Sequence, residues 1–121
     1  MNDKQRNDIA AIIDPVKKFI LADKLYEMPD VDKMDAVDIT REHIRALRYH
    51  DETMTHMKNL YMVCYMLTNI KDSADVSTPR GAKIAKEVKC ILDGLKDMKD
   101  AISAIDSKMF RILNFLERLR W

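Results

Sequence analysis

The stretch from Ile84 to Leu119, IAKEVKCILDGLKDMKDAISAIDSKMFRILNFLERL, decides the fold of this chain because its apolar side chains recur with the period of a coiled coil. Steps of four and three residues alternate along it, and no polar residue interrupts the series. Such spacing places one continuous apolar edge along an α-helix. This edge, which we call the seam, comprises Ile84, Val88, Ile91, Leu95, Met98, Ile102, Ile105, Met109, Ile112, Leu116 and Leu119. The seam predicts a long helix with a coiled-coil edge.

The segments before the seam predict that this helix belongs to a hairpin. Thr78 is a typical N-cap and Pro79 is favoured at the first helical position, so the last helix is predicted over about 79–121. A second long helix is predicted over about 39–71, because apolar residues recur there at three- and four-residue steps. These residues are Ile44, Leu47, Met54, Met57, Tyr61, Cys64 and Leu67. A short connection between two long helices favours a long antiparallel helical hairpin, and the predicted fold class is all-α.

A short N-terminal helix is predicted before the hairpin. Asp14 suits an N-cap and Pro15 suits the first helical position. The residue before a proline avoids the α-helical region, so Met28 and Pro29 are expected to end this helix. Its apolar face comprises Val16, Phe19, Ile20 and Leu25. The sequence leaves open whether this helix folds back on its own hairpin or onto another subunit. Residues 1–121 together suit a single helical domain.

Composition and motifs argue against an enzyme. The formal net charge is +1 and there are two glycines, so neither a strong global field nor a glycine-rich phosphate loop is expected. The histidines, which are His43, His50 and His56, lack the spacing of a zinc site. No serine or carboxylate lies in a recognisable catalytic motif. We therefore expect no catalytic residue, no cofactor and no metal.

The apolar runs predict a protein without a membrane partner. The longest purely apolar run, LYMVCYML at 60–67, is far shorter than the roughly 20 residues that a membrane-spanning helix needs. Cys64 and Cys90 stand alone within helical runs, which predicts buried thiols in a reducing compartment. We therefore expect a cytoplasmic, intracellular protein, with the cytoplasm of an infected host cell as one alternative.

The length of the seam predicts a homo-oligomer. When the hairpin is counted outward from its loop, Thr40 lies near Arg111, and residues 112–121 project about 15 Å beyond the second helix. The apolar side chains of this end then need a cover from the N-terminal helix or from another subunit. The expected oligomer contact comprises Ile105, Met109, Ile112, Phe115, Leu116 and Leu119. Isoleucine at the d positions favours more than two strands, and the oligomer order stays open.

Basic residues predict a second kind of binding. In the same register Arg41 and Arg45 approach Lys108 and Arg111, and Trp121 lies not far away. Positive charge combined with aromatic rings is what single-stranded nucleic acid binds, so these five are candidate nucleic-acid-binding residues. A simpler alternative is that basic residues near a helix C-terminus complement the helix dipole.

The final residues, SKMFRILNFLERLRW at Ser107 to Trp121, resemble the C-terminal helix of phage UvsY-type recombination mediators. The order of basic, aromatic, aliphatic, Asn and acidic residues carries the resemblance. The matching residues are Lys108, Phe110, Ile112, Asn114, Leu116, Glu117, Arg120 and Trp121. Members of that family are small, helical, ring-forming proteins that bind single-stranded DNA and load a RecA-like recombinase. The resemblance implies a viral protein that acts in DNA recombination and whose last helix serves assembly.

Three functional hypotheses follow from the sequence. The first is a non-enzymatic, self-associating coiled-coil protein that acts through protein–protein binding or assembly. The second is a single-stranded DNA-binding recombination mediator of the phage type. The third is a small helical inhibitor or adaptor of a larger complex, whose acidic segment at 30–38 docks on a basic partner.

Overall fold

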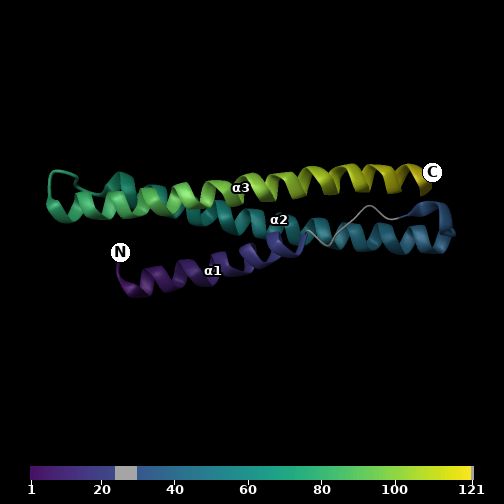
Figure 1. Ribbon diagram of the computed structural model, residues 1–121, viewed down its shortest axis with the longest axis horizontal. Coiled ribbons are helices and arrows are strands. Elements are labelled where there is room, and N and C mark those ends of the chain that lie inside the picture. Colours follow the sequence, from purple (N-terminus) through teal and green to yellow (C-terminus); the bar gives the residue numbers. More distant parts are fainter. Residues whose placement is uncertain (24–29, 121) are drawn as a thin grey trace.

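Two long antiparallel helices make up most of the molecule. In this computed structural model, α2 (Ala36–Ser73) and α3 (Pro79–Arg120) lie side by side and are joined by a turn at one end (Figure 1). A third helix, α1 (Asp3–Ala22), and a short 3-10 helix, η2 (Val31–Lys33), precede them. The structure describes residues 1–23 and 30–120, and these contain no strand. The predicted all-α fold with a long helical hairpin is confirmed.

Caps explain where the two long helices begin. Asp35 and Asp38 form a capping box at the start of α2, in which each side chain accepts the other residue's backbone N–H. The helix therefore starts at Ala36, about one turn before the predicted start at 39. At the start of α3, the Thr78 hydroxyl accepts the Gly81 N–H at 3.0 Å. This contact confirms Thr78 as the predicted N-cap.

The seam of α3 is buried within this single chain. Seven of its eleven members are at most 6% exposed, and they are Val88, Leu95, Ile102, Ile105, Met109, Ile112 and Leu116. The core face of α2 is marked by residues seven apart, which are Ala46, Thr53, Leu60 and Leu67. Thr53 is the one polar side chain among the described buried residues, and its hydroxyl donates to the backbone oxygen of Tyr49 at 2.9 Å. Packing of the seam against this face holds the hairpin together.

Helix α1 begins earlier than the sequence predicts. The predicted start at Asp14 and Pro15 is wrong, because α1 begins at Asp3 and Pro15 lies inside it. Asn2 is the N-cap, and its side chain forms a capping box with Gln5. An internal proline costs about 3 kcal/mol in a helix. The apolar face that continues on both sides of the proline offsets this cost by burial.

The end of α1 is described only as far as Asp23. The helix ends at Ala22, where the Asp23 N–H bonds to the Phe19 carbonyl oxygen. The predicted apolar residue Leu25 and the predicted end at Met28-Pro29 lie outside the described residues.

Helix α1 folds back along its own hairpin and ends well short of the hairpin end that contains the start of α2 (Figure 1). Val16 is fully buried in the hairpin core and Phe19 is 9% exposed. Near the other end of α1, Arg6 Nε donates to Glu87 Oε1 at 2.8 Å, and the Met1 amino group lies 3.1 Å from Glu87 Oε2. The hydrogen bond from Arg6, followed by the one from the amino group, holds the pKa of Glu87 below its usual value.

The C-terminal end of α3 does not project from the hairpin. The predicted projection of residues 112–121 is wrong for Ile112 and Leu116, which are at most 1% exposed. One cause is the earlier start of α2 at Ala36, which lengthens the helix beside this end. A second cause is Val31 of η2, which packs against the same cluster. The chain thus covers most of its own seam.

The two glycines of α3 predict opposite effects of alanine. A Cβ at Gly81 would lie 1.8 Å from the Asp75 carbonyl oxygen, whereas a Cβ at Gly94 would meet nothing within 4 Å. Gly81→Ala should lower the free energy of unfolding by about 1–3 kcal/mol through this clash. Gly94→Ala should raise it by about 1 kcal/mol, because alanine is the better helix former. Urea unfolding of both variants checks this, and a Gly81→Ala protein as stable as the wild type would contradict it.

The Glu87 contacts predict a pH-dependent attachment of α1. Because the folded-state pKa of Glu87 is lowered, its carboxylate stabilises the fold above the unfolded-state pKa and loses that effect as the pH falls through the folded pKa. Glu87→Gln should therefore lower the melting temperature at pH 7, and the difference from the wild type should shrink below about pH 4. The matched control is Glu117→Gln at an exposed position of the same helix. Equal melting temperatures of wild type and Glu87→Gln at pH 7 would refute the assignment.

Candidate binding surfaces

The outer face of α2 carries large apolar side chains that are exposed to solvent. Ile44, Leu47, Met54 and Tyr61 are 44–45% exposed, and Tyr65 is 70% exposed. Two exposed charged residues complete the same heptad series. We call this series the α2 stripe, and it comprises Ile44, Leu47, Asp51, Met54, Lys58, Tyr61 and Tyr65. The stripe is a mainly apolar line of exposed side chains along α2.

The stripe corrects the predicted core face of the second helix. Four of the predicted face residues, Ile44, Leu47, Met54 and Tyr61, are exposed, and the core side is the series that contains Ala46 and Leu60. Two apolar series run along α2, and the predicted face combines them, because its members Cys64 and Leu67 are buried on the core side. The true core series contains Ala and Thr, which pack closely but carry a weak hydrophobic signal.

The middle of the stripe is hollowed. Met54, Met57 and Tyr61, together with Thr55 and Lys58, line a depression of about 450 Å³. A cation from α3 borders this region, because Lys99 Nζ lies 5.8 Å from the centroid of the Tyr61 ring. This distance is within the range of a cation–π interaction. A side chain of a partner can pack into this depression.

The two cysteines differ in their surroundings. Cys64 is buried, as predicted, and burial raises the pKa of its thiol, while nearby Lys99 acts in the opposite direction with a smaller effect. Cys90 is exposed, so the prediction of a buried thiol is wrong there. Burial in the core cluster and the raised pKa of the thiol both disfavour the reactive thiolate form of Cys64.

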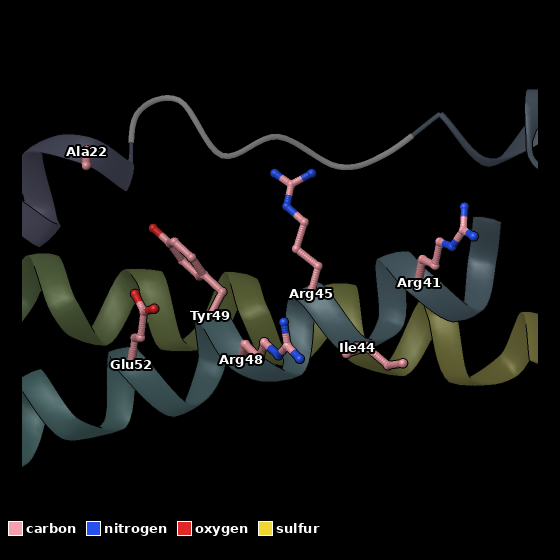
Figure 2. A pocket seen from close by; sticks show the side chains of 7 residues that line it. All are labelled: Ala22, Arg41, Ile44, Arg45, Arg48, Tyr49 and Glu52. Atoms are coloured by element: carbon pink, nitrogen blue, oxygen red, sulfur yellow. The ribbon is translucent and has the colours of Figure 1, made fainter. Parts of the chain in front are cut away.

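A basic groove lies beside the stripe at the start of α2. Figure 2 shows its lining, in which Arg41, Arg45 and Tyr49 point to the same side of the helix. The groove has a volume of about 610 Å³, and its lining is Ala22, Arg41, Ile44, Arg45, Arg48, Tyr49 and Glu52. Acidic groups reduce its positive potential, because Glu42 Oε2 lies 3.6 Å from an Arg45 nitrogen and Glu52 is part of the wall.

The predicted nucleic-acid-binding residues are only partly brought together. Arg41 and Arg45 share the basic groove. Lys108 donates to both carboxylate oxygens of Asp23 at 2.8 and 2.7 Å, so its charge is compensated at the end of α1. Arg111 is exposed on α3. Trp121 lies outside the described residues. Arg48 also lines the groove but is not among the predicted residues. The spacing of Arg41, Arg45 and Arg48, which places all three on one helical face, could have indicated it.

The predicted oligomer contact lies mostly inside the chain. Ile105, Met109, Ile112 and Leu116 are at most 4% exposed in one chain, which corrects the premise that they need a second subunit as cover. Phe115 and Leu119 remain 38% and 43% exposed. Self-association stays a prediction, and Phe115 and Leu119 are the predicted contact residues that offer exposed surface for it.

Several other polar residues singled out in the sequence have local structural roles. In the acidic segment, Asp30 caps η2, and Asp35 caps α2 together with Asp38. His50 Nε2 lies 3.2 Å from Asp106 Oδ1 on α3. Within residues 1–23 and 30–120 no group of three or more His, Cys, Asp and Glu side chains could hold a metal ion. In the same part of the chain, none of the helices has a stretch of the length and hydrophobicity needed to span a lipid bilayer.

The resemblance of Ser107 to Trp121 to UvsY-type mediators stays a prediction. The described part of this segment is the last portion of α3, with Ile112 and Leu116 on its buried side and Phe110 on its exposed side. Comparison of the chain with protein-family models, with curated proteins and with solved structures found no match.

Proposed function

We propose that this protein is a non-enzymatic helical protein that acts through protein–protein binding and self-associates through the α2 stripe. The observation that carries the proposal is the exposure of Leu47, Met54 and Tyr61 at heptad spacing on a face that α1 and α3 leave uncovered. Contiguous exposed apolar surface is typical of interaction sites. Burying it against another protein is favourable by about 25 cal/mol per Å² of apolar area.

The chemistry of the stripe favours a helix as the binding element of the partner. A heptad series packs knobs into holes against another helix. Tyr61 and Tyr65 belong to the residue types that contribute most to binding at interfaces, because they bury a large rigid ring at a low cost in conformational entropy. The stripe is uninterrupted because it lies within the single continuous helix α2.

Lysine substitutions in the stripe test this proposal. The wild type should show a mass above the 14.1 kDa of one chain in light scattering at up to about 100 µM. Met54→Lys/Tyr61→Lys should reduce the mass to that of the monomer, because two buried cations would be unpaired in the interface. The matched control is Phe110→Lys, which removes an exposed aromatic ring from another helix.

The fold of each variant is checked by its helical circular dichroism. A monomeric wild type over the whole concentration range contradicts self-association. An oligomer that survives Met54→Lys/Tyr61→Lys places the contact somewhere other than the α2 stripe.

A second candidate function is binding of single-stranded nucleic acid in the basic groove. The observation that favours it is the presence of Arg41, Arg45 and Arg48 beside the ring of Tyr49 in one groove (Figure 2). Arginines bind phosphates, and an aromatic ring stacks with bases. Asp23 accepts the hydroxyl hydrogen of Tyr49 at 2.6 Å, which holds the ring at the edge of the groove.

Salt-dependent binding of an oligonucleotide tests this second function. A fluorescent single-stranded oligonucleotide should bind at low salt, and its affinity should fall steeply as salt is added. Arg41→Glu/Arg48→Glu should weaken binding at least about tenfold, because two phosphate contacts are lost. Lys17→Glu/Lys18→Glu, at exposed positions of α1, is the control of equal charge change. An equal loss in both variants, or no binding at low salt, excludes the groove.

A further inference from the structure

The charges of the α2 stripe are complementary to those of the same stripe in reverse direction. Ile44, Asp51, Lys58 and Tyr65 lie seven residues apart, and the midpoint of this series falls between Met54 and Thr55. Asp51 and Lys58 lie on opposite sides of this midpoint, each about 5 Å from it along the helix. Along the chain, these four residues are apolar, acidic, basic and apolar, and the two charged ones flank the centre.

We propose that two copies of the chain pair through their α2 stripes in antiparallel orientation, about a two-fold axis between Met54 and Thr55. In this pairing Asp51 faces the partner's Lys58, and the partner's Asp51 faces Lys58, so two equivalent ion pairs form. This inference rests on the proposed self-association through the stripe and names its partner and register. A two-fold interface requires a self-complementary surface, and the stripe has that property.

The apolar residues of the stripe fit the same register. Ile44 faces the partner's Tyr65 at each end, and Leu47 lies opposite the partner's Met62, one residue from the partner's Tyr61. Met54 lies next to the axis and packs against its own copy. Thr55 is short, and its hydroxyl is bonded to the Asp51 carbonyl oxygen of its own helix at 3.0 Å. A short side chain with a satisfied hydroxyl next to the axis lets the two helices approach closely.

The charges select this orientation over the parallel one. In a parallel pair, Asp51 would face the partner's Asp51 and Lys58 would face the partner's Lys58, which is repulsive at both levels. All stripe residues are exposed in the single chain, so neither α1 nor α3 has to move for a second copy to dock. Exposed ion pairs add little affinity. The apolar side chains therefore supply the binding energy, and the charges set the register.

A second copy of this chain fits the stripe better than a partner of another sequence. It would have to place a cation opposite Asp51 and an anion opposite Lys58 at the same spacing, between apolar side chains. The chain already carries this arrangement on a rigid helix, and a homodimer satisfies both charges at once.

Charge reversal measured by sedimentation equilibrium tests the pairing. The full-length wild type should be a dimer of twice 14.1 kDa. Asp51→Lys and Lys58→Asp should each raise the dimer dissociation constant at least about tenfold, because symmetry turns two attractions into two repulsions. The double variant Asp51→Lys/Lys58→Asp should restore the wild-type constant. An equimolar mixture of the two single variants should form a heterodimer with both ion pairs attractive.

The outcomes separate this inference from the proposed function. Single variants that dimerise as tightly as the wild type overturn the antiparallel register. If Met54→Lys/Tyr61→Lys is monomeric in the same experiments, the proposed self-association through the stripe is retained. Single variants that stay equal to the wild type while their mixture binds more tightly indicate the parallel pair and also overturn the proposal. A monomeric wild type overturns the inference together with the proposed self-association. Asp93→Lys, an equal charge reversal at an exposed position of α3, is the control for effects of substitution alone.

Discussion

Burial of the α3 seam against the core face of α2 is the interaction on which the rest of the structure depends. Ile102 and Leu60 belong to the same core cluster and are fully buried in one chain. Val16 of α1 enters this cluster from the side. Since the chain covers most of its own seam, we place self-association on another surface.

That constraint makes α2 a helix with two different faces. Its core face combines the small residues Ala46 and Thr53 with Leu60 and Leu67, and all four are fully buried. Other large apolar side chains, such as Met54 and Tyr61, lie on the outside. An apolar outer face on a helix held rigid by its hairpin is well suited to binding another helix. Because the seam covers one side of α2, the opposite side with its apolar side chains is the one we propose for binding.

The sequence predicts local features of the fold better than it predicts the choice between helical faces. The Thr78 cap and the two long helices follow from local patterns, and the structure confirms them. The start of α1 was mispredicted at Pro15, because burial of a continuous apolar face overrides the local cost of a proline. The register was missed as well: His50 approaches Asp106, whereas counting from the loop places Asp106 opposite Arg45. Tertiary packing sets this register, and spacing along one helix carries no information about it.

An isotope-filtered nuclear Overhauser experiment on a mixture of labelled and unlabelled chains tests the central claim most directly. It detects only contacts between different chains. The account predicts no such contact from the seam methyl groups of Val88, Ile102 and Ile112, which are buried within their own chain, and predicts interchain contacts from Met54 and Tyr61. Strong interchain contacts from the seam methyl groups would contradict the account, because the seam would then be shared between subunits.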